Sequence, residues 1–345
     1  MITVAIDAEH TRQTSAGTAR ASRSLVRALS DRADVRPIVL GGGPVLERGT
    51  LRKRLATARQ DFYWYPFGGR RAAARAGADV YHCPTPRAPL TRGRPPLVVT
   101  VHDLVPVLFP DTMTPWSRLY ARATTSRVLD AADIIVVPSH DTANDLTAHL
   151  GVSSDRIRVV WNGVDAVFFA EPPAESPVRG PYVLFVGTPE PRKNLPRLVE
   201  AMEALRARGL PHRLVVAGGG GWGRVHVDPQ SVQLVGRVSD AELLALYSHA
   251  ECLALPSLHE GFGLPAAEAM AAGTPVVAGA RGALPEIVGS AGVLVDPYDV
   301  NAIAAGIESA ITDRERLAVA GRARARQFSW EKAAESMVSI YRELL

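Results

Sequence analysis

The segment Glu260-Gly261-Phe262-Gly263-Leu264-Pro265-Ala266-Ala267-Glu268, EGFGLPAAE, decides the fold. An apolar run, Cys252–Ser257, precedes it, and Gly273-Thr274-Pro275 ends the helix that we expect to follow. A strand, a glycine turn and a helix in this order are typical of an α/β protein with a parallel sheet. Ligands of open α/β sheets bind at the carboxyl ends of the strands. The two carboxylates and the turn between them therefore predict a ligand pocket at that edge.

Similar apolar runs, each followed by a helical pattern, recur along the chain, as buried parallel strands do. They form two sets of about six on either side of a Pro-rich stretch, Ala170–Pro181. The first set comprises Ile2–Asp7, Val35–Leu40, Asp79–Cys83, Leu97–Leu104, Ile134–Ser139 and Arg158–Gly163. The second comprises Tyr182–Gly187, Arg213–Gly218, Val232–Gly236, Cys252–Ser257, Pro275–Gly279 and Gly292–Asp296. Two doubly wound, Rossmann-like domains explain this pattern better than a single eight-stranded barrel.

The expected domains are residues 1–169 and 182–328, joined by a linker at 170–181 and followed by an amphipathic helix at 329–345. A chain of 345 residues with 47% apolar and 21% charged residues is an ordinary soluble globular protein with room for two cores. The cysteines, Cys83 and Cys252, fall in different expected domains, so no disulfide framework is implied. Residues 1–8 do not resemble a signal peptide, and no apolar run approaches membrane-spanning length. We therefore expect a cytoplasmic protein, soluble or peripheral at the inner face of a membrane.

The charge is distributed unevenly. Residues 1–165 hold 22 Lys and Arg against 15 Asp and Glu, a net +7, whereas the remainder holds 17 against 20, a net −3. Basic clusters occur at Arg52-Lys53-Arg54, at Arg70, Arg71 and Arg75, and at Arg87, Arg92 and Arg94. A basic half suggests an anionic partner such as a membrane surface, a phosphorylated acceptor or nucleic acid. The alternative explanation for the basic clusters is that they form the solvated surface of an arginine-rich chain and bind no partner.

Two turns of the second half suggest an anion site. In Gly187–Leu195, GTPEPRKNL, Arg192 and Lys193 follow a strand and could clamp a diphosphate. The backbone N–H groups of Gly261–Leu264, at the start of a helix, form a second anion-binding element. The alternative is that Glu260 and Glu268 are surface charges near a helix end.

The stretch Gly218–Gly223 formally matches the dinucleotide fingerprint G-x-G-x-x-G. It leads into Arg224–Ser231, which contains Pro229 and no helical pattern, so a nicotinamide site is disfavoured. A loop near a nucleotide is the better interpretation.

In the first half, Gly17 lies between a strand and a helical pattern, where it lets a ligand approach the backbone. His102, beside Asp103, follows a strand and is a candidate site residue. His82 and Cys83 lack partners for a metal site, so no metal centre is expected.

These motifs resemble the retaining glycosyltransferases of family 4, which have the GT-B fold of two Rossmann-like domains with a cleft between them. The resemblance covers nearly the whole chain. It is carried by GTPEPRKNL at 187–195, by Val235-Gly236-Arg237-Val238, and by PSLHEGFGLPAAEAM at 256–270, which contains the E-x7-E signature of the family. One departure is Thr188, where many members carry an Arg.

The resemblance implies a nucleotide-sugar donor bound by the second domain and a hydroxyl acceptor bound by the first. Arg192 and Lys193 would neutralise the diphosphate, Glu260 would face the sugar, and His102 would reach it from the first domain. Donor binding would further involve Gly17, Gly187, Arg237, Val238, Gly261, Phe262, Gly263, Leu264 and Glu268. The base would lie near Arg237 and Val238, the ribose near Glu268, and the last helix would return to the first domain.

The resemblance also implies transfer with retention, without metal or cofactor, because fixed cations and helix amides can stabilise the leaving diphosphate. The string EPRKN resembles enzymes that use GDP-mannose, and UDP-sugars are the alternative donors. The basic clusters and the aromatic run Phe62-Tyr63-Trp64-Tyr65 predict an anionic membrane surface and a lipid-linked or polysaccharide acceptor, and no nucleic acid. Three alternatives are a transferase acting on a small soluble metabolite, a glycoside hydrolase, and a non-catalytic GT-B protein that binds sugar nucleotides.

Overall fold

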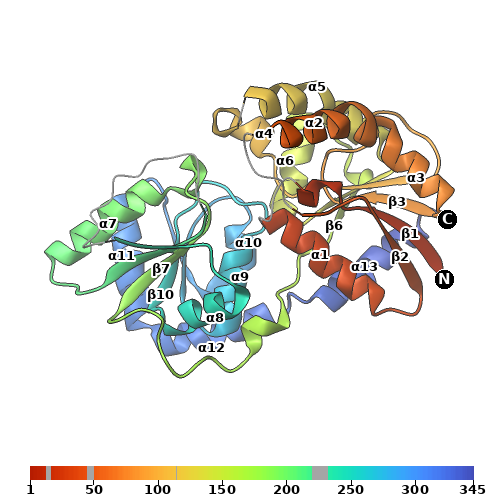
Figure 1. Ribbon diagram of the computed structural model, residues 1–345. Coiled ribbons are helices and arrows are strands. Elements are labelled where there is room, and N and C mark those ends of the chain that lie inside the picture. The colour runs from red at the N-terminus through yellow and green to blue at the C-terminus, as the bar shows by residue number, and fades with distance from the viewer. Residues whose placement is uncertain (13–16, 45–49, 114, 220–231) are drawn as a thin grey trace. The chain divides into compact units, whose positions relative to one another are not determined.

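The chain was analysed as a computed structural model that describes residues 1–12, 17–44, 50–113, 115–219 and 232–345. It forms two compact units (Figure 1). The first unit comprises Met1–Gly163 together with Trp330–Leu345, and the second comprises Val164–Ser329. Each is an α/β layer structure around a six-stranded sheet whose paired strands run parallel. The expected fold class is therefore confirmed.

In the first unit the strands are arranged in the order β2-β1-β3-β4-β5-β6. Their bounds are β1 Ile2–Asp7, β2 Val35–Leu40, β3 Val80–Cys83, β4 Leu97–Thr100, β5 Ile134–Val137 and β6 Ile157–Val159. The helices are α1 Gly17–Ser30, α2 Leu51–Arg59, α3 Gly69–Arg75, α4 Val105–Leu108, α5 Pro115–Ala131, α6 His140–Leu150 and α13 Trp330–Arg342, with a π-helical segment, η2, at Gln60–Gly68.

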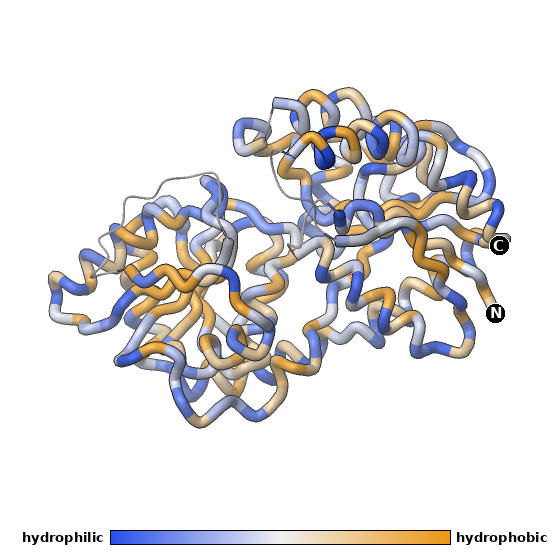
Figure 2. The backbone as a smooth tube through the Cα atoms, viewed as in Figure 1, coloured by the Kyte–Doolittle hydropathy of each residue, from blue (hydrophilic) through white to orange (hydrophobic). Residues whose placement is uncertain are grey.

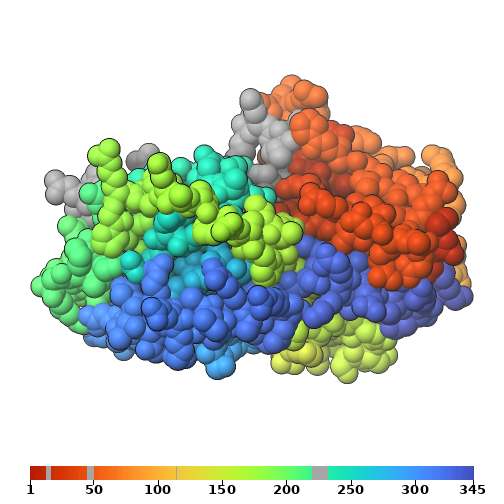
Figure 3. All heavy atoms as spheres, turned by 90° about the horizontal axis from the view of Figure 1, so that it is seen from below, coloured from red at the N-terminus to blue at the C-terminus, as the bar shows by residue number. Residues whose placement is uncertain are grey.

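Alternation along the strands of the first sheet places its side chains in two separate cores. Val4 and Val98 face α1 and α13, whereas Ala5 and Val99 belong to the core that includes residues of α3, α5 and α6. Helix α13 therefore packs beside α1 although it lies at the other end of the chain, and Figure 3 shows the C-terminal segment against N-terminal residues. Figure 2 shows the apolar strands inside the unit.

In the second unit the strand order is β12-β11-β10-β7-β8-β9. The bounds are β7 Tyr182–Val186, β8 Arg213–Ala217, β9 Val232–Gly236, β10 Cys252–Leu255, β11 Val276–Gly279 and β12 Val293–Val295. The helices are α7 Leu195–Ala207, α8 Asp240–His249, α9 Leu264–Ala272, α10 Leu284–Val288, α11 Val300–Thr312 and α12 Arg314–Ala325. Helices α7 and α11 pack together, and α9 contacts α8, α10 and α12.

Eleven of the twelve apolar runs that predicted a strand contain one, although most strands are shorter than expected. The twelfth run, Arg158–Gly163, only overlaps β6, which begins one residue earlier, at Ile157. The division between the units falls after Gly163, earlier than the expected boundary at residue 169. The reason is that the 3-10 helix η5, Ala166–Phe169, packs on α8 and α9, where Phe168 meets Tyr247 edge to face. Among the described residues, no helix is long and apolar enough to cross a membrane.

Candidate functional site

The second sheet reverses its winding between β7 and β10, which lie side by side in the strand order. At such a switch point the loops that follow the two strands diverge and leave a crevice at the carboxyl edge. Here those loops are the segments at 187–194 and 256–263, the two turns that the sequence singled out. The topology therefore brings the cationic turn and the acidic turn to one place.

Glu260 joins the two turns through ion pairs. Its Oε1 accepts a hydrogen bond from Lys193 Nζ at 2.5 Å and another from Ser257 Oγ at 2.8 Å. Its Oε2 accepts one from an Arg192 guanidinium N–H at 3.3 Å. The side chains of Lys193 and Glu260 are only 10% and 8% exposed. The result is a cluster of one carboxylate and two cations at the switch point, in which Lys193 and Glu260 are buried and Arg192 is partly exposed.

The electrostatics of this cluster keep Glu260 ionised. Burial alone would raise the pKa of Glu260, but the charges of Lys193 and Arg192 and the hydrogen bonds from Lys193 and Ser257 lower it to about 2. Arg192 also donates to Glu190 Oε2 at 3.0 Å and to the His259 carbonyl at 3.1 Å. Arg192 is thereby shared between two acids, while Glu260 is the acid that Lys193 pairs with.

Asn194 fixes the position of the cationic turn, a role that the sequence analysis missed. Its Nδ2 donates to the carbonyls of Pro256 at 3.0 Å and Pro297 at 2.6 Å, which tie the turn to the ends of β10 and β12. The residue is buried and has a φ of +59°, a conformation that Asn tolerates better than most residues. The signal was available as an Asn directly after the Arg-Lys pair and before Leu195, the first residue of α7.

Glycines permit close backbone approach around the same edge. Gly187 follows β7, and a side chain at Gly218 would lie 2.0 Å from the Gly187 carbonyl oxygen. Gly282 has a φ of +60°, and a side chain there would lie 2.8 Å from the backbone N and O of Glu260. The backbone behind Glu260 is therefore packed too tightly for a residue other than glycine at position 282.

Helix α9 begins at the acidic turn. Gly263, with a φ of +89°, occupies the N-cap position without a side-chain cap, and Leu264 and Pro265 form the first turn. Phe262 turns away from solvent and packs edge to face on Phe328 at 5.5 Å, so the turn offers its backbone rather than an aromatic ring. Glu268 is buried inside α9 and accepts a hydrogen bond from the Tyr247 hydroxyl at 3.1 Å.

Arg237 and Val238 lie past the end of β9, at the edge of the sheet. The Arg237 side chain passes over Gly219, where an added Cβ would approach its Nε to 2.4 Å. Since β8 separates β9 from β7, this pair lies beyond the Gly187 turn as seen from Glu260. Residues 220–223 of the glycine-rich stretch lie outside the described residues.

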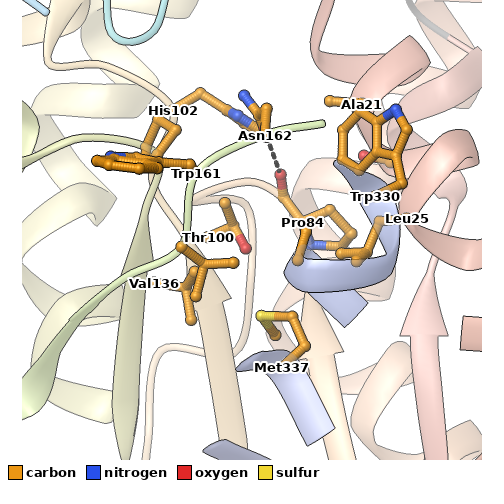
Figure 4. Close-up of a pocket in the computed structure, with 14 residues that line it drawn as sticks. Ala21, Leu25, Pro84, Thr100, His102, Val136, Trp161, Asn162, Trp330 and Met337 are labelled. Atoms are coloured by element: carbon orange, nitrogen blue, oxygen red, sulfur yellow. Dashed lines mark hydrogen bonds between the residues drawn. The ribbon is translucent and has the colours of Figure 1, made fainter. Parts of the chain in front are cut away.

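His102 and Gly17 belong to the first unit. Gly17 is exposed at the start of α1, and His102 follows β4, with its Nε2 3.1 Å from the Pro84 carbonyl oxygen (Figure 4). Because a carbonyl only accepts, this ring donates from Nε2 and keeps Nδ1 as an acceptor. Burial lowers the pKa of His102, which favours the neutral ring.

His82 is a structural residue rather than a metal ligand. Its Nδ1 lies 2.8 Å from the Tyr341 hydroxyl and its Nε2 lies 2.8 Å from Thr100 Oγ1. Both ring nitrogens are thereby occupied inside the core between the sheet and α13. Cys83 and Cys252 are buried free thiols in separate units.

Comparisons with known proteins agree with this geometry. Residues 169–327 match the family described as glycosyl transferases group 1, and residues 15–168 match glycosyltransferase family 4. The chain is 32% identical over 289 residues to O-antigen chain mannosyltransferase B of Escherichia coli, covering 77% of this chain and 74% of that protein. It is 35% identical over 290 residues to a D-inositol 3-phosphate glycosyltransferase of Xylanimonas cellulosilytica, covering 71% and 66% of the two chains. It is 36% identical over 231 residues to an MMP alpha-(1->4)-mannosyltransferase of Mycolicibacterium hassiacum, covering 61% and 54%.

Solved structures share the fold over the full length. Sucrose-phosphate synthase from Thermosynechococcus elongatus superposes with a TM-score of 0.73 at 24% identity, and the match covers 100% of this chain and 99% of the synthase chain. Anabaena HepE in complex with UDP and glucose gives a TM-score of 0.72 at 18% identity, with 99% and 100% covered.

Proposed function

The chain belongs to the family 4 glycosyltransferases, and from this premise we propose that it moves a hexose from a nucleoside diphosphate sugar to a hydroxyl acceptor with retention. The observation that carries the proposal is the cluster of Lys193, Arg192 and Glu260 at the switch point of the second sheet, beside the amides that open α9. Two cations and a helix N-terminus at one sheet edge suit a diphosphate.

Departure of the leaving group creates negative charge, and the chain offers fixed groups to stabilise it without a metal ion. The bond between the anomeric carbon and the phosphate oxygen breaks while the acceptor oxygen bonds to that carbon from the same face. The acceptor proton passes to the departing phosphate oxygen. Lys193 and Arg192 stabilise the developing charge, and their present pairing with Glu260 holds them in place until a diphosphate arrives.

The remaining donor contacts follow from the order of groups along the edge. Glu268, inside α9, accepts hydrogen bonds from the ribose hydroxyls. Without a donor sugar nucleotide, the Tyr247 hydroxyl donates to Glu268 instead. The base lies toward Arg237 and Val238. Glu260 faces the sugar once the cations shift to the diphosphate.

GDP-mannose is the favoured donor. Two of the relatives named above are mannosyltransferases, and both have a sequence likeness of 30% or more to this chain. UDP-sugars remain the second candidate, because HepE was crystallised with UDP and glucose.

A thermal-shift panel of GDP-mannose, UDP-glucose and a dTDP-sugar tests the donor, run with and without EDTA. A ligand at 100 times its Kd stabilises the folded state by about 2.7 kcal/mol, which raises Tm by a few degrees. We expect the largest shift from GDP-mannose, unchanged by EDTA. A larger shift with UDP-glucose would identify a UDP-sugar as the donor. A shift abolished by EDTA would refute metal independence, and no shift with any of the three would refute the binding of these sugar nucleotides.

The acceptor is proposed to be lipid-linked, because the first unit carries an exposed apolar and basic face. The large apolar side chains of this face are Leu51, Leu55, Phe62, Tyr63, Phe67, Trp116 and Leu119. Phe62 and Trp116 lie 5.9 Å apart, so the face is continuous from η2 to α5. Exposed Arg52 and Arg54 border it.

Only part of the aromatic run contributes to this face. Trp64 donates from Nε1 to Asp7 Oδ2 at 2.7 Å, and Tyr65 is 1% exposed, so both support the core. The run therefore contributes only Phe62 and Tyr63 to this face, because the π-helical turn places consecutive residues on both sides of the segment.

Binding to vesicles that contain phosphatidylserine tests the proposed membrane contact. Replacing Arg52, Lys53 and Arg54 by Ser should weaken binding by roughly 100-fold, at about 1 kcal/mol per charge. Replacing Arg206 and Arg208, which are exposed on and beside α7 of the second unit, is the control. Equal effects of the two sets, or none, would favour a soluble acceptor.

A further inference from the structure

The second unit carries an exposed tyrosine that contacts two arginines at the carboxyl edge of its sheet. Tyr298 follows β12 and is 49% exposed. The guanidinium carbon of Arg281, which follows β11, lies 5.0 Å from the centre of the Tyr298 ring, and that of Arg197, in the first turn of α7, lies 5.4 Å from it. Both distances are typical of cation–π contacts. We call these three residues the arginine–tyrosine patch.

The arginine–tyrosine patch adjoins the ion cluster of Glu260 but contains none of its residues. Arg197 donates to Asn194 Oδ1 at 2.9 Å, and Asn194 is the residue that fixes the cationic turn. Arg281 directly precedes Gly282, which packs against the backbone of Glu260. The patch is therefore held beside the proposed diphosphate site by the same contacts that shape that site.

The strand order places the patch on one side of the diphosphate site and Arg237 on the other. The sheet runs β12-β11-β10-β7-β8-β9, with Arg281 and Tyr298 after β11 and β12, the ion cluster after β10 and β7, and Arg237 after β9. With the base of the donor toward Arg237, as proposed above, the patch lies on the side of the diphosphate away from the base. The sugar, and the acceptor that takes it, extend from the diphosphate on that side.

The two arginines of the patch have no carboxylate partner in the described part of the chain. Neither Arg197 nor Arg281 forms an ion pair there. The acids of the neighbouring loop, Asp296 and Asp299, accept hydrogen bonds from backbone N–H groups instead. The like charges of the two arginines repel, and a tyrosine ring offsets only part of that repulsion. An anion that reaches both guanidinium groups therefore gains more from the patch than a neutral group does.

A phosphate monoester suits two guanidinium groups better than a carboxylate does. It carries a charge of about −2 at pH 7 on three acceptor oxygens, whereas a carboxylate carries a single charge. The planar fork of a guanidinium group also matches phosphate oxygens in a bidentate arrangement. Arg281 is exposed and Arg197 is half-buried, so both are open to a ligand that comes from solvent.

We propose that the arginine–tyrosine patch binds a phosphate monoester carried by the acceptor, which is then a phosphorylated sugar or polyol, free or at the head of a lipid. The inference rests on the proposed transfer to a hydroxyl, and it adds the chemical class of the acceptor. The phosphate at the patch is distinct from the donor diphosphate, which pairs with Lys193 and Arg192.

Calorimetry with glycerol 3-phosphate, and with glycerol as its uncharged counterpart, tests the patch in the full chain. Saturation with GDP or UDP, whichever binds, first fills the diphosphate site, so that the probe cannot use Lys193 and Arg192. Glycerol 3-phosphate should bind at least tenfold more tightly than glycerol, and Arg281→Gln should weaken its binding roughly tenfold. Arg206→Gln, which replaces an exposed arginine in the last turn of α7, is the matched control and should leave that binding unchanged.

The same variants separate the patch from the donor site. Because Arg281 is exposed, Arg281→Gln should keep the Tm of the parent chain and its affinity for GDP or UDP. If that variant does not fold, Tyr298→Leu takes its place, because it removes the ring that both arginines contact. An equal loss of nucleotide affinity would assign the patch to the donor and overturn the inference. Equal affinities for glycerol 3-phosphate and glycerol, or an equal loss in Arg206→Gln, would also overturn it.

Vesicles of phosphatidylcholine that contain phosphatidic acid identify the source of the phosphate. Weaker vesicle binding by Arg281→Gln than by Arg206→Gln would assign the phosphate to a lipid headgroup. Equal vesicle binding by the two variants, together with lost glycerol 3-phosphate binding in Arg281→Gln, would assign it to a soluble acceptor.

The proposed function and the phosphate site can fail separately. A chain that binds a sugar nucleotide but does not prefer glycerol 3-phosphate to glycerol would retain the transferase and refute the patch. A chain that needs Arg281 to bind glycerol 3-phosphate, but binds no sugar nucleotide, would retain the phosphate site and refute its role as an acceptor site.

Discussion

Glu260→Gln should raise the affinity for the nucleoside diphosphate while it lowers turnover. The substitution keeps the shape of the side chain and removes the charge that pairs with Lys193 at 2.5 Å and Arg192 at 3.3 Å. A simple loss of structure would lower both quantities together. The opposite directions therefore identify the charge of Glu260 as the cause.

The stability effect follows from the pKa of Glu260. Its shift from 4.5 to about 2 corresponds to about 3 kcal/mol of preference for the ionised form in the folded state. Because the folded pKa is depressed, this contribution is present above pH 4.5 and is lost as the pH falls toward 2. Glu260→Gln should thus lower the free energy of unfolding by about 3 kcal/mol at pH 7 and by less at pH 3.

The binding effect has the same origin and the opposite sign. Two unit charges 4 Å apart near a protein surface interact by about 4 kcal/mol, and a bound diphosphate must replace Glu260 as the partner of both cations. Removing that competitor should tighten GDP or UDP binding roughly tenfold, which is about 1.4 kcal/mol. Turnover should fall by about 10² or more, since the proposed role of Glu260 toward the sugar is lost.

Calorimetry with GDP and UDP and initial rates of transfer are the assays. Glu190→Gln is the control, since Glu190 pairs with Arg192 at 3.0 Å. It should change turnover far less than Glu260→Gln. Weaker diphosphate binding by a folded Glu260→Gln protein would refute the reasoning, as would equal losses of turnover in both variants.

Three further predictions concern other groups. Glu268→Gln should weaken donor binding by about 2 kcal/mol with little change in kcat, whereas Tyr247→Phe, which removes only the present hydrogen bond, should leave donor affinity nearly intact by calorimetry. Asn194→Ala should lower the free energy of unfolding by about 3 kcal/mol; Asn194→Gly, which tolerates the φ of +59°, should lose only the three side-chain hydrogen bonds, to Pro256, Pro297 and Arg197, as urea unfolding would show. Burial lowers the pKa of His82 to about 3, so protonation of the unfolded chain below pH 6.5 should lower stability by about 2 kcal/mol between pH 7 and 5. His82→Asn should remove that part of the pH dependence, and an unchanged slope would contradict it.

The strands could be predicted because parallel strands buried on both faces appear as short continuous apolar runs. The boundary between the units could not, because it depends on η5 packing on α8 and α9, which no local pattern records. The residues proposed for the site of the second unit were selected from turn chemistry, and the switch point between β7 and β10 explains why those turns meet. The inward direction of Trp64 could not be predicted from the aromatic run, because its hydrogen-bond partner, Asp7, is far away in sequence.

The pairing between Glu260 and Lys193 could not be inferred either, since the two residues are separated by 67 positions and each had its own proposed ligand contact.

The pairing between Glu260 and Lys193 matters for ligand selectivity. Without Glu260, Lys193 would lose the carboxylate with which it pairs and Arg192 would keep Glu190. A phosphate that entered could then pair with Lys193 without competition, and a buried unpaired charge is strongly destabilising. With Glu260 in place, a ligand must displace the carboxylate from both cations and offer the backbone of the α9 turn a second anionic or hydroxyl group. A diphosphate attached to a sugar and a ribose meets those requirements, whereas inorganic phosphate meets only the first. We therefore expect inorganic phosphate to bind weakly to the parent chain and measurably tighter to Glu260→Gln. Equal phosphate affinities of the two proteins would show that the Glu260 carboxylate does not exclude phosphate from the site.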